Sequence, residues 1–191
     1  MLLHSSQPDA TVDEMEPWFI ATEPFTPQDG KRWLDYIQWS GLTQLAEVIS
    51  LDSMLCPSVL TEVKADYWPH IVNEDFMLGY FVNLEFLKRE ISSVARKNLL
   101  CVLRNPSDEP AQLPIEGFRF LGYDLVDIQN SNSALTNCGG FPEVFANSEL
   151  SSTGLLTDFR RAMEVQRALR FRYPEEIHAN CNLWAIFRST G

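Results

Sequence analysis

The chain has 191 residues, of which 45% are hydrophobic and 21% are charged, and its formal net charge at pH 7 is −11. These values are typical of a globular chain that buries a core, and they exclude a wholly disordered or fibrous protein. We expect a single domain over residues 14–191, preceded by a polar, disordered tail over residues 1–13.

The negative charge is unevenly distributed along the sequence. Residues 1–87 contain fourteen Asp and Glu against three Lys and Arg, whereas residues 88–191 contain twelve of each class. An acidic half of this kind repels the phosphates of nucleic acids and attracts a basic protein. The charge therefore predicts a basic protein partner and no direct contact with nucleic acid, although acidity that only keeps the protein soluble is the alternative.

The N-terminal residues and the cysteines indicate a cytoplasmic protein. Met1 to Leu3 are followed at once by polar residues, so no apolar run reaches the length of a signal peptide or a membrane span. We therefore expect no contact with a membrane. The cysteines lie far apart without a Cys-x-x-Cys spacing, and this favours reduced thiols over disulfides; they are Cys56, Cys101, Cys138 and Cys181.

The sequence of the first half of the chain predicts one strand and two helices. Residues 18–21 form a short apolar run that is typical of a strand. A helix should begin at Thr26 and Pro27 and end at Gly41, with an apolar face formed by Trp33, Leu34 and Ile37. Residues 42–60 show no clear period and are predicted only to be partly buried. A second helix should follow Asn83 and extend over residues 84–97.

The second half predicts strands at residues 99–103, 118–128 and 183–187 and a helix over residues 156–171. The long run at 118–128 reads as a strand in the middle of a covered sheet, because apolar residues occupy both of its alternating faces. Phe118, Phe120, Val126 and Ile128 would lie on one face, and Leu121, Tyr123 and Leu125 on the other.

The connection between residues 103 and 118 is short and contains several prolines. A connection of this length favours an antiparallel pair of strands over a crossover. The predicted fold class is therefore α+β, with a mainly antiparallel central sheet and about three helices packed on it.

Residues 61–76 form a candidate partner-binding segment, in which acidic and large aromatic residues alternate around Pro69. Exposed aromatic rings and carboxylates are residue types that anchor protein interfaces. The alternative is a connecting loop whose aromatic rings pack back onto the core. The predicted partner-binding residues are Asp66, Tyr67, Trp68, Glu74 and Asp75.

The sequence Cys138-Gly139-Gly140 supplies an alternative, enzymatic hypothesis. If a helix began there, its N–H groups would stabilise a Cys138 thiolate, with His178 as the base and Asp124 or Asn137 as the orienting group. This would make the protein a cysteine-dependent hydrolase or transferase, with a pocket around Asp124, Asn137, Cys138 and His178. The competing interpretation is a glycine turn in which Cys138 only fills space, and the sequence shows no known signature of a cysteine hydrolase.

Asp124 lies inside the long predicted strand, where a carboxylate requires a partner. The expected partners are Arg104, Arg119 or a backbone N–H, unless Gly122 bends the strand and exposes the side chain. His178 and Cys181 would point to opposite sides of an extended segment, and no phosphate-binding glycine loop is present. We therefore predict no cofactor and no metal.

The sequence as a whole favours a small acidic binding protein over an enzyme. Its composition resembles that of bacterial immunity proteins and nuclease inhibitors, which neutralise a basic toxin or nuclease through acidic patches and a few Trp, Tyr and acidic anchors. The resemblance is one of composition, and no motif identifies a family.

Overall fold

The computed structural model describes residues 16–110 and 115–191, so the predicted tail at residues 1–13 lies outside the described residues. Within the described residues, a four-stranded antiparallel sheet and three α-helices confirm the predicted α+β class. The strands are β1 (Trp18–Thr22), β2 (Asn98–Arg104), β3 (Phe118–Val126) and β4 (Asn182–Ser189). Their order across the sheet is β1-β2-β4-β3.

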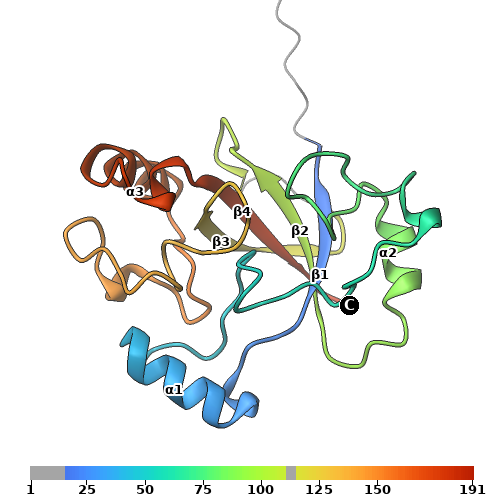
Figure 1. Ribbon diagram of the computed structural model, residues 1–191, viewed down its shortest axis with the longest axis horizontal. Helices are drawn as coiled ribbons and strands as arrows, with labels where there is room; N and C mark the ends of the chain where they lie inside the picture. The colour runs from blue at the N-terminus through green and yellow to red at the C-terminus, as the bar shows by residue number, and fades with distance from the viewer. Residues whose placement is uncertain (1–15, 111–114) are drawn as a thin grey trace, which may run out of the picture.

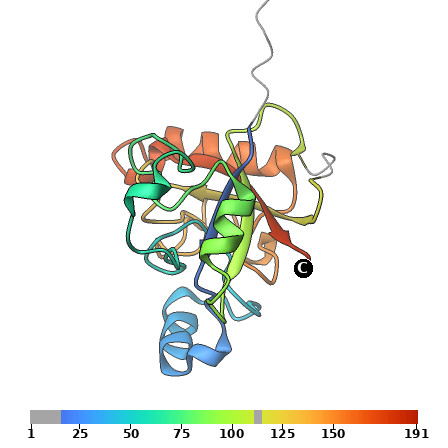
Figure 2. The same ribbon diagram turned by 90° about the vertical axis from the view of Figure 1, so that its right-hand side faces the viewer.

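The helices surround the twisted sheet at its two ends and along its lower side in Figure 1. The helix α2 (Leu84–Glu90) lies beside β1, and α3 (Phe159–Arg172) lies beside β3 and β4 at the other end. The helix α1 (Lys31–Ser40) lies apart from both, below the sheet in Figures 1 and 2. Buried side chains on both faces of the sheet therefore pack against these helices and against long irregular segments.

The predicted direct pairing of β2 with β3 is wrong, because β4 lies between them and pairs antiparallel with both. The strand β3 is consequently at an edge of the sheet rather than in its middle. All of these strands are apolar on both faces, so the sequence pattern did not distinguish an inner strand from a covered outer one. Ile128, predicted to be part of the strand, lies beyond its end and is 51% exposed.

Both outer strands have short backbone partners along their free edges. Phe19 of β1 and Phe81 exchange two backbone hydrogen bonds of 2.8 Å. At the opposite edge, the N–H of Tyr123 donates to the carbonyl of Leu156 at 2.7 Å, and the N–H of Ala134 donates to the carbonyl of Leu125 at 2.7 Å. These contacts satisfy edge groups that would otherwise be open to another chain, and they lie along the second half of β3, where residues 122–126 are all buried.

A β-bulge in β3 changes the predicted arrangement of its faces. The register with β4 shifts between Phe120 and Gly122, so Leu121 is an extra residue in the strand. Phe118 and Phe120 therefore pack on the same side as Tyr123, whereas Leu121 packs on the other side. Strict alternation along residues 118–128 fails at this point because a bulge inserts one residue into the period of two.

The buried face of α1 also differs from the prediction. Trp33 and Tyr36 are buried, whereas Leu34 is 67% exposed. A 3-10 turn at Pro27–Asp29 precedes the α-helix, and Gly30 separates the two elements. The α-helical period therefore starts at Lys31, later than the Thr26 cap predicts, and this rotates the face that meets the core. The predicted stop at Gly41 is confirmed, with Gly41 in the left-handed conformation.

Two other segments differ in length or regularity from the prediction. The helix α2 ends at Glu90 instead of continuing to residue 97, although Ile91 beyond its end is still buried. Residues 42–60 contain neither an α-helix nor a strand, yet Val48, Ile49 and Leu51 within them are buried. This segment is thus a core layer made of irregular chain.

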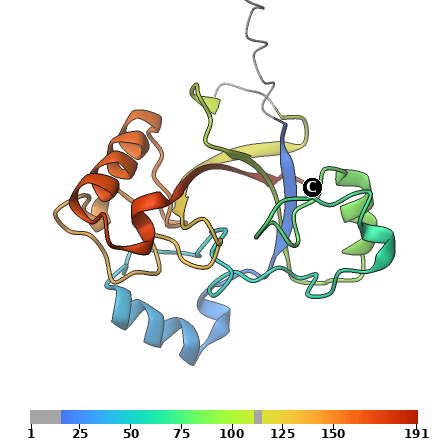
Figure 3. The ribbon, with the colours of Figure 1, turned by 45° about the horizontal axis from the view of Figure 1, so that its top comes forward.

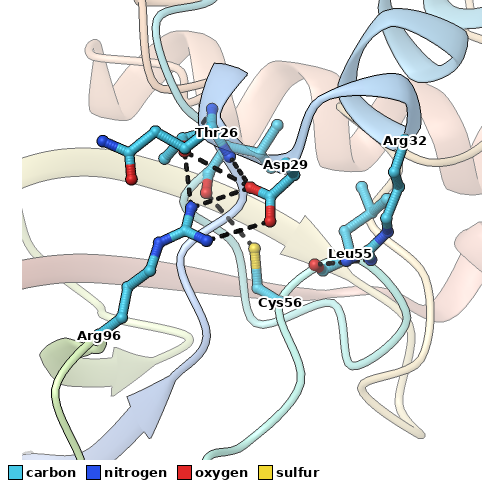
Figure 4. Close-up of polar contacts among 8 residues, drawn as sticks. Thr26, Asp29, Arg32, Leu55, Cys56 and Arg96 are labelled. Carbon is cyan, nitrogen blue, oxygen red and sulfur yellow. Dashed lines mark hydrogen bonds and ion pairs between the residues drawn. The ribbon is translucent and has the colours of Figure 1, made fainter.

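An ion pair connects the start of α1 to the segment that leads into β2 (Figure 4). The Arg96 guanidinium lies 3.0 Å from one carboxylate oxygen of Asp29 and 3.2 Å from the other, and it donates to the Thr26 hydroxyl at 2.7 Å. Asp29 also accepts from the Thr26 N–H at 2.7 Å, which closes a capping box. The guanidinium accordingly lowers the pKa of Asp29 below its usual range.

Replacing Gly122 with Ala should destabilise the protein by about 2 kcal/mol or more. A Cβ at this position would lie 2.6 Å from the carbonyl oxygen of Leu156, which is backbone already fixed by its bond to Tyr123. Chemical denaturation would measure the change. Gly139→Ala is the matched control, because Gly139 also has a positive φ, of 78°, but has nothing within 4 Å of the added Cβ. Equal losses in the two variants would contradict the described bulge.

Candidate functional site

The predicted partner-binding segment folds as an irregular hairpin beside β1 and α2, at the right of Figure 3. Its two arms are joined by the backbone N–H of Val72, which donates to Tyr80 at 2.8 Å, and by that of Val82, which donates to His70 at 2.8 Å. Residues 73–79 form the connecting loop. The second arm also pairs with β1 through Phe81, so the hairpin is attached to the edge of the sheet.

The structure separates the predicted partner-binding residues into two groups. Trp68 is 58% exposed, and Asp66 and Asp75 are exposed. Tyr67 is instead 2% exposed, and its hydroxyl donates to Glu90 at 3.0 Å. Glu74 forms an ion pair of 2.8 Å with Arg104. Tyr67 and Glu74 are therefore occupied within the fold, and Asp66, Trp68 and Asp75 are available to a partner.

Apolar residues that the sequence analysis missed are exposed on the same hairpin. Phe76 is 54% exposed, Leu78 is 67% exposed and Val82 is 46% exposed. We refer to Asp66, Trp68, Asp75, Phe76, Leu78 and Val82 as the 66–82 surface. The sequence around Gly79 gave a weak indication of these exposed residues, because apolar residues in a loop have no helix or strand face that would direct them into the core.

Phe76 is held in an unusual backbone conformation, with φ at 65° although it is not glycine. The left-handed region costs such a residue about 1 kcal/mol. The Asn130 amide donates to the Phe76 carbonyl at 3.1 Å, and Met77 next to it is 2% exposed. The fold thus accepts backbone strain while leaving the Phe76 ring half-exposed, a combination found where a side chain is positioned for a function.

Part of the acidic charge of residues 1–87 is paired with basic side chains in the fold. Five of these carboxylates form ion pairs, three of them with arginines of the second half of the chain: Asp29 with Arg96, Asp35 with Lys31, Glu47 with Arg188, Glu74 with Arg104 and Glu85 with Lys88. Asp66 and Asp75 form no ion pair with any residue that the structure describes. Glu16, Glu23 and Glu62 are likewise exposed and form no ion pair with a described residue, so the 66–82 surface contains two of five such carboxylates in the described part of this half.

The alternative site is only partly assembled. Asn137, Cys138 and His178 line one cavity of about 470 Å³, next to Phe141 and Tyr173. Asp124, the fourth predicted pocket residue, is fully buried elsewhere and does not line the cavity. No α-helix begins at Cys138, because residues 138–145 form bends, irregular chain and a turn at residues 142–144. The helix dipole expected to stabilise a thiolate is therefore missing from this described segment.

The environment of Cys138 keeps its thiol protonated. The Sγ atom donates to the carbonyl of Ala134 at 2.9 Å, and burial raises the pKa of Cys138 to about 11. Among the described residues, no hydrogen bond connects Cys138 with His178, and burial lowers the pKa of His178. In this arrangement the thiol is not activated by a hydrogen bond to the imidazole, as the nucleophile of a cysteine hydrolase would be.

Asp124 is the centre of a buried polar network, and it has hydroxyl and amide partners instead of the predicted arginines. One carboxylate oxygen accepts from the Ser133 hydroxyl at 2.6 Å and from the Leu125 N–H at 2.8 Å. The other accepts from the Ser50 hydroxyl at 2.5 Å and from the Leu51 N–H at 3.3 Å. Burial nevertheless raises the pKa of Asp124 to about 6.

A second buried carboxylate, Asp52, adjoins this network. It accepts from the N–H of Ser133 at 2.8 Å, so Ser133 bridges Asp52 and Asp124. Burial raises the pKa of Asp52 as well. Asp124 attaches loops to the sheet, Asp52 joins one loop to another, and neither carboxylate lines the cavity beside Cys138.

Within residues 16–110 and 115–191, no three His, Cys, Asp or Glu side chains gather closely enough to hold a metal ion. In the same part of the chain, the helices are too short and too polar to cross a membrane. Comparison with protein-family models, with curated proteins and with solved structures finds no match to this chain.

Cys138 should react with iodoacetamide at neutral pH at least about tenfold more slowly than free cysteine, because a raised pKa leaves little thiolate. Mass spectrometry of timed samples would measure its rate, and urea-unfolded protein is the control in which all the cysteines react. A native rate at or above that of free cysteine would contradict this description of the thiol.

The unfolding free energy of the wild type should rise, relative to that of Asp124→Asn, as the pH falls from about 7.5 to about 5, by roughly 1 kcal/mol. The reason is that the folded-state pKa of Asp124 is raised, so the folded state binds a proton before the unfolded state does. Urea denaturation at each pH would give the difference. A difference that stays constant would show that the folded-state pKa of Asp124 is not raised, and a difference that falls with decreasing pH would show that it is lowered. Either result would contradict this description of Asp124.

Proposed function

We propose that this protein is a protein-binding module whose 66–82 surface binds a basic protein, in the manner of an inhibitor or immunity protein. The observation that carries the proposal is the presence, on one hairpin, of half-exposed apolar side chains and of two carboxylates, Asp66 and Asp75, that form no ion pair with a described residue. Aromatic and aliphatic anchors supply binding energy on desolvation, and nearby carboxylates select a cationic partner.

The attachment of the surface to the sheet supports a binding role. Phe81 pairs with β1, Glu74 pairs with Arg104 at the end of β2, and Asn130 holds the carbonyl of Phe76. Anchors that are already ordered lose little conformational entropy when a partner binds. Trp68 and Phe76 are thus presented from a fixed frame, which favours recognition of one folded partner.

The partner's basic character is inferred from local charge. Asp66 and Asp75 lie on the same hairpin as the apolar anchors, and the net charge of the whole chain is −11. Complementary charge speeds association and excludes acidic partners more than it adds affinity. We therefore expect the association rate to decrease as the salt concentration increases.

The enzymatic alternative has less support. The cavity beside Cys138 contains a protonated thiol, and the most perturbed carboxylate, that of Asp124, lies outside it. A binding function requires only the exposed groups described above, whereas a cysteine-dependent reaction would require these groups to rearrange.

Trp68→Ser should weaken capture of the basic partner by about tenfold or more, because an aromatic anchor lost from the centre of an interface costs at least 1 to 2 kcal/mol. Affinity measurements on the captured and purified partner would test this. Trp39→Ser is the matched control, since Trp39 is 55% exposed but belongs to α1. The proposal is wrong if Trp68→Ser and Trp39→Ser bind the partner equally well.

Reversing the local charge with either Asp66→Lys or Asp75→Lys, made as separate variants, should slow association by about tenfold at low salt, with a smaller effect at high salt. Glu116→Lys is the charge-matched control, because Glu116 is exposed and precedes β3 at the far edge of the sheet. A partner that proves acidic, or an association rate that is the same for all these variants, would contradict the assignment of a basic partner.

A further inference from the structure

The cavity beside Cys138 has a lining that no part of the proposed protein-binding function uses. Its volume of about 470 Å³ falls in the range of small-molecule sites, roughly 300 to 1,000 Å³. None of the residues that line it belongs to the 66–82 surface. Loop residues 132–141 form one side of the cavity, and residues 173–178 after α3 form the other.

His178 is the unusual residue of this lining. It is 3% exposed, yet neither ring nitrogen has a hydrogen-bond partner among the described residues. A buried polar group without a partner costs about 1 to 3 kcal/mol, and such groups in native proteins require an explanation. Because burial lowers the pKa of His178, the ring is neutral near pH 7 and offers one donor and one acceptor.

The charge of the lining is negative. Glu176 is the one Asp, Glu, Lys or Arg among the lining residues, and it forms no ion pair with the described part of the chain. Burial raises the pKa of Cys138 and lowers that of His178, and the negative charge of Glu176 acts to raise both values. An anionic ligand would be repelled here, and a cation would be attracted.

The remaining lining favours a flat cation. The rings of Phe141 and Tyr173 lie with their centroids 4.9 Å apart, and aromatic faces attract guanidinium groups. Asn132 and Asn137 add amide groups on the loop side. A guanidinium has five N–H donors in one plane, which suits a carboxylate, amide oxygens and an unprotonated imidazole nitrogen arranged around aromatic walls.

We propose that the cavity lined by Asn137, Glu176 and His178 binds a small organic cation through its guanidinium group. Glu176 supplies the charge, the aromatic wall borders one face of the group, and His178 accepts from one of its N–H donors. Cys138 remains a neutral wall residue, and binding involves no covalent step.

Calorimetric titration with agmatine, a guanidinium amine, would test this site. We expect a dissociation constant between about 10 μM and 1 mM, and binding at least about tenfold weaker for the ureido analogue. That analogue keeps the amine and the shape of agmatine and replaces the charged guanidinium with a neutral group. Agmatine should also shift the NMR signals of the His178 ring.

Two exposed neighbouring carboxylates provide the variant and its control. Glu176→Gln should weaken agmatine binding by about tenfold, whereas Glu175→Gln should leave it within about twofold, because Glu175 does not line the cavity. Absence of binding up to about 10 mM, equal affinity for the ureido analogue, or equal losses in the two variants would each overturn the proposal. None of these outcomes bears on the 66–82 surface.

Discussion

A buried carboxylate that bridges separate segments of chain is the constraint on which the other features of this molecule depend. Asp124 lies in β3 with no exposed surface, and it accepts hydrogen bonds from Ser50 and Ser133 in two different loops. Removing an acceptor of this kind leaves several buried donors unsatisfied at once, which costs more than the loss of any single bond. The network therefore fixes the course of loops that have no regular secondary structure of their own.

The same loops carry the residues from which we infer function. The loop that begins after β3 contains Asn130, whose amide holds Phe76 in the 66–82 surface, and it continues to Asn137 and Cys138 at the cavity. Ser133 lies between these positions and is attached to both Asp52 and Asp124. A buried network in the core thus positions an apolar, acidic surface on one side and a polar cavity on the other. Ordered loops on a rigid sheet are a common basis for recognition.

Local patterns in the sequence predicted the elements well, and they failed where long-range contacts decide the structure. The Gly41 stop, the Asn83 cap and the apolar strand runs depend on neighbouring residues, and all are found as expected. The position of β4 between β2 and β3 depends on pairings across the whole chain. The bulge before Gly122 and the late start of α1 each change which side chains face the core, so predicted core residues such as Leu34 lie on the exposed face.

The candidate sites show the same limit. An alternation of acids and aromatics located the candidate hairpin, but only the fold separates the buried Tyr67 from the exposed Trp68 beside it. The Cys-Gly-Gly sequence located a cavity, although burial of Cys138 and the missing helix start remove the expected thiolate. The position of Glu176 in the cavity lining could not be predicted from the sequence, because it results from the packing of the segment after α3 against a loop far away in the sequence.

Hydrogen–deuterium exchange of the protein with and without its captured basic partner tests the central claim most directly. The amides of residues 73–79, which form the exposed connecting loop of the hairpin, should exchange more slowly in the complex, while those of residues 139–140 at the cavity should be unchanged. Protection confined to segments outside residues 66–82 would show that the partner binds elsewhere and would contradict the account.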